Sequence, residues 1–116
     1  MSDIFCKIIS GEVNAEKIDE GENWIAIHDI HPVAPVHALI IPKKHGPLRD
    51  YENEEDGKLM GRLILAANRV ATKLGLDKDG YRLIINYGED SQAHVLDHLH
   101  IHLLGGKKLG SKIIQN

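Results

Sequence analysis

The chain has little of three features that would each point to a particular class of protein. It has a single cysteine, Cys6, so no disulfide can form within the chain. Its net charge is −3, so it lacks the excess of basic residues that a wide nucleic-acid surface needs. It has no secretion signal and no run of about 18 apolar residues that would span a membrane. We therefore expect one domain over residues 1–116, cytoplasmic, without nucleic-acid or membrane partners.

The pattern of apolar residues predicts an α+β fold. A short helix is expected within residues 2–11, capped by Ser2 or Asp3, and a long amphipathic helix over residues 54–74. Short strands are expected in five places, namely two within 17–30 joined by a turn at 20–23, then 36–42, 80–87 and 98–106. Hairpin-like connections outnumber βαβ units, which favours an antiparallel sheet packed on a helix.

The segment DHLHIHLL, residues 97–104, carries the strongest chemical signal. Three of the eight histidines, His98, His100 and His102, occupy every second position of an expected strand. Because side chains alternate along a strand, these three rings share one face, and the apolar residues between them face the opposite way, toward the long helix. The histidine face then borders either solvent or a cleft.

The residue types alone leave three uses of this face open. It is a polar strand surface without a function, or it binds zinc with His37 or His45 as a further ligand. In the third use a neutral imidazole attacks phosphorus and forms a covalent phospho-histidine. Flanking imidazoles would then donate to phosphate oxygens or move a proton to the leaving group.

HLHIHLL followed by GG resembles the signature of the histidine triad (HIT) superfamily. Three further segments resemble its Hint-like branch in the same order and spacing: IFCKIISGEVNAEKI, HDIHPVAPVHALIIPKKH and GLDKDGYRLIINYGED. The resemblance implies a five-stranded antiparallel sheet with one long and one short helix, extended across a homodimer. It implies hydrolysis of purine nucleoside 5′-phosphoramidates, such as AMP linked to an amine, through a nucleotidyl-histidine intermediate, with no cofactor required.

The same resemblance implies roles for four histidines. His100 matches the nucleophile, and His102 matches the residue that bonds the α-phosphate. The carbonyl group of His98 is expected to accept from the other ring nitrogen of the nucleophile, which would fix its tautomer. His37 matches a fourth histidine beside the triad, for which a structural role is as open as a catalytic one.

The nucleoside site follows from the resemblance in the same way. Ile27 and Ile30 match positions that pack on the base, and Asp29 matches a carboxylate that accepts from the ribose hydroxyls. Such a carboxylate selects ribose over deoxyribose, since the deoxy sugar leaves an acceptor unpaired. Asn86 matches an asparagine on the phosphate or ribose side.

The loop before the triad departs from the family pattern. Family members carry Gly-Gln, then Ser, Thr or Glu, then Val, whereas here His94 and Val95 hold the Gln and Ser positions. Gln92 stands two residues too early, and the loop from Asn86 is about one residue longer. Either the loop bulges so that Ser91 or Gln92 reaches the site, or the contact is missing and leaving-group handling is weaker.

A second departure concerns zinc. Some bacterial relatives bind a structural zinc ion with Cys-x-x-Cys in the first helix and two histidines. Here Asp3 takes the first cysteine position, which leaves Asp3, Cys6, His45 and His98 as a mixed set. A carboxylate in place of a thiolate weakens such a site, so we expect no bound metal.

Two other functions remain open for a chain of this kind. One is a dinucleoside polyphosphate hydrolase that uses the same histidines. The other is a nucleotide-binding or sensor module with little activity, which the apolar Val95 before the triad favours.

Overall fold

Five short strands form one antiparallel sheet in the order β1-β2-β3-β5-β4. The strands are β1 (Lys17–Glu20), β2 (Trp24–His28), β3 (Val36–Pro42), β4 (Tyr81–Ile85) and β5 (Ile101–Gly105). The computed structural model describes residues 3–111, so the alternative cap Ser2 lies outside the described residues. The predicted fold class, α+β with a five-stranded antiparallel sheet, is confirmed.

The two predicted helices are present, and both begin at side-chain caps. In α1 (Ile4–Ile9) the carboxylate of Asp3 accepts from the Cys6 amide, and in α2 (Glu54–Lys73) Asn53 forms a capping box with Asp56. Single turns of 3-10 helix, η1 (Leu48–Asp50) and η2 (Glu89–Ser91), lie in the loops. Neither α-helix is long and apolar enough to cross a membrane.

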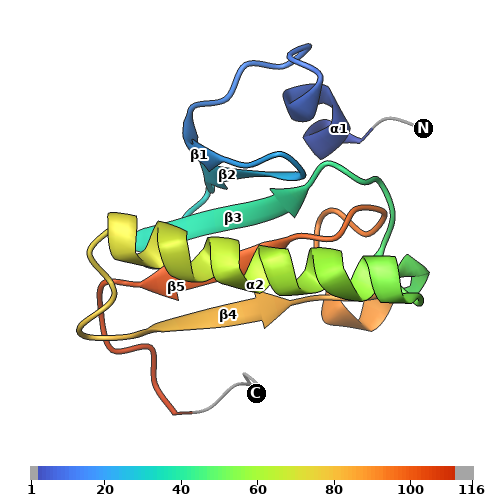
Figure 1. The fold of residues 1–116 in the computed structure, drawn as a ribbon. Helices are drawn as coiled ribbons and strands as arrows, with labels where there is room; N and C mark the ends of the chain where they lie inside the picture. Colours follow the sequence, from blue (N-terminus) through green and yellow to red (C-terminus); the bar gives the residue numbers. More distant parts are fainter. Residues whose placement is uncertain (1–2, 112–116) are drawn as a thin grey trace.

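The helices cover opposite faces of the sheet (Figure 1). α2 packs on a cluster that contains the inward residues of three neighbouring strands and of the segment before β5, namely Ala26, Ala38, Ile40, Leu99, Ile101 and Leu103. On the other face Phe5 and Ile8 of α1 pack on Ile25, Ile27, Leu39 and Ile41. The apolar residues between the histidines therefore lie under α2, as the two-residue period predicts.

The expected strand over residues 98–106 is shorter in the structure. β5 begins only at Ile101, and residues 98–100 run beside the loop after β3, where the Leu99 amide donates to the Gly46 carbonyl at 2.8 Å. The ladder stops because Pro42 has no N–H, and its carbonyl accepts from the Nε2 atom of His98 at 2.8 Å. His98 is thus held by its side chain and by an isolated backbone bridge to Gly46, outside the β5 ladder.

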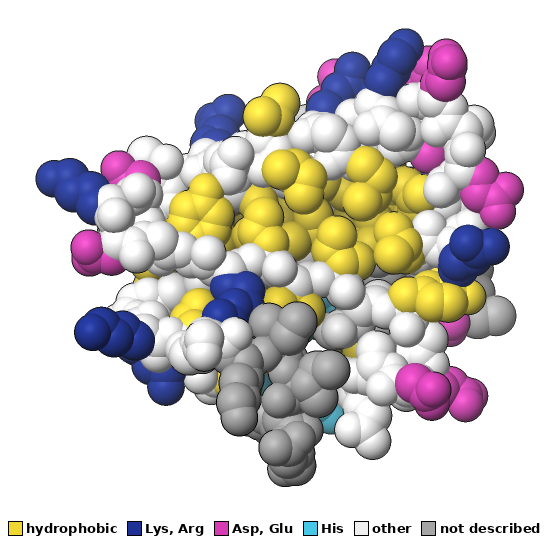
Figure 2. Space-filling view, turned by 90° about the horizontal axis from the view of Figure 1, so that it is seen from below, with side chains coloured by type: hydrophobic (Ala, Val, Ile, Leu, Met, Phe, Trp, Pro, Cys, Tyr) yellow, Lys and Arg dark blue, Asp and Glu magenta, His cyan; other side chains and the backbone are white. Residues whose placement is uncertain are grey.

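One apolar surface is left uncovered beside β4, an edge strand of the sheet. Tyr81, Leu83 and Ile85 of β4 are only half-buried, although each points toward α2. Asn68 of α2 accepts from the Tyr81 hydroxyl, so Ile64, one turn earlier on α2, lies on the same side. Seen from below, this side of the molecule is a continuous field of hydrophobic side chains (Figure 2).

The packing of α2 on the sheet makes a direct prediction about stability. Leu63 is fully buried at the centre of α2, whereas its near neighbour Leu65 is 67% exposed. We expect Leu63→Ala to lower the free energy of unfolding by about 2–5 kcal/mol because it leaves a cavity. Leu65→Ala is the control, with a change within about 0.5 kcal/mol. Urea unfolding curves measure both, and equal losses would contradict this account of the core.

Candidate active site

The best-placed nucleophile is His100, which is 7% exposed. Its Nδ1 atom donates to the carbonyl oxygen of His98 at 2.9 Å, as expected from the sequence. A neutral ring that donates from Nδ1 keeps a free lone pair on Nε2. Burial lowers the pKa of His100 more than the hydrogen bond to His98 raises it, so the ring is neutral near pH 7. The ring of Phe5 packs edge-on against it, with 4.9 Å between centroids.

A directed chain of hydrogen bonds leads from the backbone to His102. The Val33 amide donates to Nδ1 of His37 at 3.2 Å, which places the proton of the neutral His37 ring on Nε2. Nε2 of His37 lies 2.9 Å from Nδ1 of His102 and therefore donates to it. His102 then accepts at Nδ1, so its own proton lies on Nε2. This series of hydrogen bonds makes His102 a donor at Nε2, the ring nitrogen that does not face His37.

The His102 ring is held in its neutral form. Burial, together with the neighbouring His100 and His37 rings, lowers its pKa to about 4. Burial also lowers the pKa of His37, which the nearby Asp29 carboxylate only partly offsets. Three neutral imidazoles thus stand in one row, with 5.0 Å between the ring centroids of His100 and His102 and 5.2 Å between those of His102 and His37.

Two of these histidines, His37 and His102, line a cavity of about 960 Å³ on the α1 side of the sheet. His100 is not part of the wall, but its ring packs against that of His102. Most of the remaining wall is apolar, with Ile4, Phe5, Ile8 and Val13 from α1 and the segment that follows. A cavity of this size with few polar groups at one end is typical of a small-molecule site.

The four residues predicted for the nucleoside also meet at this cavity. Ile27 is 5% exposed and belongs to the core under α1, whereas Ile30 is 85% exposed at the rim. Asp29 directs one carboxylate oxygen at the His31 amide, at 2.8 Å, and the other at Nε2 of His37, at 3.3 Å. Asn86 follows β4 directly and reaches the same wall.

The unusual loop before the triad bulges into the cavity wall. Gln92 has a left-handed backbone with φ of 58°, which is rare for a residue other than glycine. Ser91, Gln92 and His94 all line the cavity, although the Ser91 hydroxyl already donates to the Gly88 carbonyl at 2.6 Å. Val95 lines the cavity as well and also packs on the core beneath α1. Of the two alternatives left by the sequence, the structure shows the bulged loop, which brings the exposed side chains of Gln92 and His94 to the cavity wall.

The possible zinc ligands Asp3, Cys6, His45 and His98 are also brought together. Their donor atoms lie within 4.8 Å of one another, and Oδ2 of Asp3 is 3.1 Å from Nδ1 of His98 and 3.0 Å from Nδ1 of His45. Since Nε2 of His98 donates to Pro42, its Nδ1 presents a lone pair to the Asp3 carboxylate. Two facing acceptors need a proton or a cation between them, so these four residues fit a tetrahedral cation.

Asp3 keeps its negative charge in this cluster. Burial alone would raise the pKa of the Asp3 carboxyl, but the hydrogen bond from the Cys6 amide and, when a proton lies between Nδ1 and the carboxylate, the neighbouring His98 ring hold it below the usual value. Asp3 thus both caps α1 and attaches it to the histidine segment, as the set of four residues named from the sequence requires.

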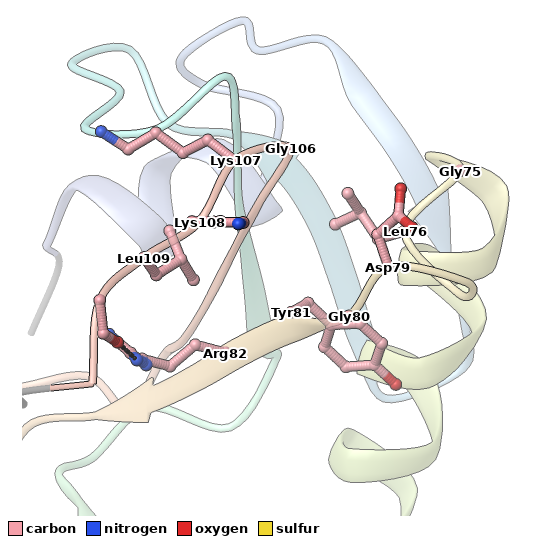
Figure 3. A pocket seen from close by; sticks show the side chains of 11 residues that line it. Gly75, Leu76, Asp79, Gly80, Tyr81, Arg82, Gly106, Lys107, Lys108 and Leu109 are labelled. Carbon is pink, nitrogen blue, oxygen red and sulfur yellow. Dashed lines mark hydrogen bonds between the residues drawn. The ribbon is translucent and has the colours of Figure 1, made fainter.

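A second cavity, of about 660 Å³, opens at the far end of β4 and β5 (Figure 3). Its wall includes Arg82, Lys107 and Lys108, and the guanidinium group of Arg82 donates to the Gly110 carbonyl at 2.6 Å. Among the described residues, neither a histidine nor a cysteine lines it. The cavity therefore lacks the nucleophiles that distinguish the histidine site.

Comparison with known proteins identifies the class. The HIT domain family matches residues 10–109. The chain is 44% identical to a HIT-like protein of Chlamydia pneumoniae over 108 residues, 93% of this chain and 96% of the relative. It superimposes on the HIT family hydrolase of Clostridium thermocellum with a TM-score of 0.89, at 46% identity over 96% of each chain. The HIT family hydrolase of Legionella pneumophila gives 0.87 at 39% identity, over 94% of this chain and 96% of the other.

The fold is that of the HIT family hydrolases to which the chain is similar. The chain belongs to the HIT family, so the predicted membership of the histidine triad superfamily is confirmed.

Two contributors to the site were missed at the sequence level. No role in the site was predicted for Phe5, yet its ring packs against both His98 and His100. The Val33 amide fixes the tautomer of His37, and a backbone donor leaves no signal in residue type.

The buried neutral His102 ring predicts a pH dependence of stability. Its pKa is about 4 in the folded chain against an ordinary value of 6.5, so the unfolded chain takes up this proton first as the pH falls. The free energy of unfolding should therefore decrease between pH 6.5 and 4, and His102→Asn should remove part of that decrease. Urea midpoints of both proteins across this range measure the effect. Parallel curves would show that His102 is not buried in its neutral form.

Proposed function

We propose that this chain hydrolyses purine nucleoside 5′-phosphoramidates through a nucleotidyl-histidine intermediate on His100. The observation that carries the proposal is the hydrogen bond of Nδ1 of His100 to the His98 carbonyl, which leaves the lone pair of the neutral ring on Nε2. The similarity to family hydrolases supports the reaction class.

The proposed reaction has two displacements at one phosphorus atom. Nε2 of His100 attacks the α-phosphorus, and a P–N bond to the imidazole forms as the P–N bond to the amine breaks. The amine leaves with the bonding electron pair and one proton, which Nε2 of His102 or solvent donates and which the water of the second displacement gives back. Water then attacks the phosphorus, which releases the nucleoside monophosphate and the imidazole. The donor on Nε2 of His102 suits the phosphate oxygens or the leaving amine, where charge develops.

The apolar part of the cavity suits the nucleoside. Ile27 and Ile30 provide apolar contact for a purine, and the Asp29 carboxylate provides acceptors for ribose hydroxyls. Asn86 offers a neutral donor and acceptor on the same wall. Val95 has no hydroxyl to donate, whereas Gln92 on the same cavity wall carries an amide group, so we propose that Gln92 contacts the leaving group.

We propose that no metal takes part in this chemistry. A Zn²⁺ ion held by Asp3, Cys6, His45 and His98 would have all four tetrahedral positions filled by protein. Such an ion would fix α1 against the histidine segment without activating water. The nucleophile and the donors of the proposed reaction are side chains outside that set. The set contributes only the backbone carbonyl of His98, which accepts from Nδ1 of His100.

The nucleophile assignment predicts a separation of binding from turnover. His100→Asn should reduce hydrolysis of a fluorogenic adenosine 5′-phosphoramidate by at least about 10³-fold, since only binding and electrostatic contributions remain. AMP affinity, measured by calorimetry, should stay close to that of the wild type. A chelator in the assay should leave wild-type turnover unchanged. Comparable turnover in His100→Asn would refute the assignment, and wild-type AMP binding without turnover would indicate a sensor module instead.

We also propose that the chain forms a homodimer through β4. Within residues 3–111 no strand pairs with the outer edge of β4, and the apolar field beside it is shown in Figure 2. A two-fold pairing of β4 with its copy would continue the sheet and cover Ile64 together with the half-buried side chains of β4.

This arrangement predicts different effects for two adjacent substitutions on α2. Ile64→Glu places a charge on the apolar field beside β4 and should convert the dimer into a monomer. Leu65→Glu is the matched control, because Leu65 lines a groove with Trp24 and Arg69 away from β4. Sedimentation equilibrium measures the mass of each protein. A dimer that persists in Ile64→Glu, or is lost only in Leu65→Glu, would place the interface elsewhere.

A further inference from the structure

The Asp29 carboxylate contacts His37, which is hydrogen-bonded to His102, and it also lines the cavity. Its side chain is 19% exposed, and its Oδ1 atom is held by the His31 amide at 2.8 Å. Its Oδ2 atom lies 3.3 Å from Nε2 of His37. One oxygen is thus fixed by the backbone, while the other faces the histidine that positions His102.

The His37 ring has one proton for two acceptors. Because the Val33 amide donates to Nδ1, that proton lies on Nε2. Nε2 faces Nδ1 of His102 at 2.9 Å and Oδ2 of Asp29 at 3.3 Å. A single N–H cannot serve both fully, so the carboxylate competes with His102 for the proton of His37.

We infer that Asp29 is a positioning residue that couples ribose binding to the donor on His102. This inference rests on the proposed function, in which the ribose hydroxyls donate to Asp29. When they do, the carboxylate oxygens are engaged and the competition for His37 ends. The His37 proton is then given to Nδ1 of His102, which secures the proton of His102 on Nε2 for the phosphate or the leaving amine.

The coupling separates two effects of the sugar hydroxyls. A carboxylate that only binds ribose changes KM, whereas a carboxylate that also releases His37 changes kcat. The 2′-deoxy substrate should therefore raise KM and also lower kcat by about tenfold, the size of one net hydrogen bond.

His37→Gln tests the competition directly. The amide nitrogen of glutamine carries two protons, so it can serve both His102 and Asp29, and its oxygen can accept from the Val33 amide. In this variant the 2′-deoxy substrate should still raise KM, but its effect on kcat should disappear. An unchanged kcat ratio between the two substrates in His37→Gln would overturn the coupling.

A second measurement needs no turnover. In histidine labelled with ¹⁵N, long-range proton–nitrogen correlation spectra report which nitrogen of His102 carries the proton. AMP should shift His102 to the Nε2–H form more completely than 2′-deoxy-AMP does. Equal responses to the two nucleotides, or none to either, would overturn the coupling even if His37→Gln fails to fold. A difference between them without phosphoramidate turnover would support the coupling and count against the proposed reaction alone.

Discussion

The alternation of residues 98–103 is the constraint on which the rest of the site depends. Leu99, Ile101 and Leu103 are buried beneath α2, and their burial fixes the backbone on which the three histidines stand. A shift by one residue would expose these apolar side chains and bury the imidazoles without partners. The stability of the core and the alignment of the nucleophile are therefore one property of a single segment.

That alignment is completed by hydrogen bonds that each define a tautomer. The His98 carbonyl leaves the lone pair of His100 on Nε2, and the Val33 amide acts through His37 to leave a proton on Nε2 of His102. Neighbouring rings of one residue type thus present opposite functions, an acceptor and a donor. Burial keeps both rings neutral, which the proposed attack and proton donation require.

Much of this could be predicted from the sequence, because it depends on periodicity and on local caps. The helix over residues 54–73, the turn before Trp24 and the opposed faces around the triad follow from apolar spacing and turn residues. The start of β5 could not be predicted in this way, because it depends on the Pro42 carbonyl, a group 56 residues away from His98. The left-handed backbone conformation of Gln92 could not be predicted either, since one extra loop residue can be accommodated in several ways.

The position of the only tryptophan has a practical consequence. Trp24 lies on β2 under α2, within the cluster that contains Leu63 and Leu103, while the histidine cavity opens on the opposite face of the sheet. Its indole emission therefore reports the separation of α2 from the sheet and not the filling of the cavity. Intrinsic fluorescence is a probe of unfolding in this chain, whereas a ligand titration followed by fluorescence needs a label on the α1 side.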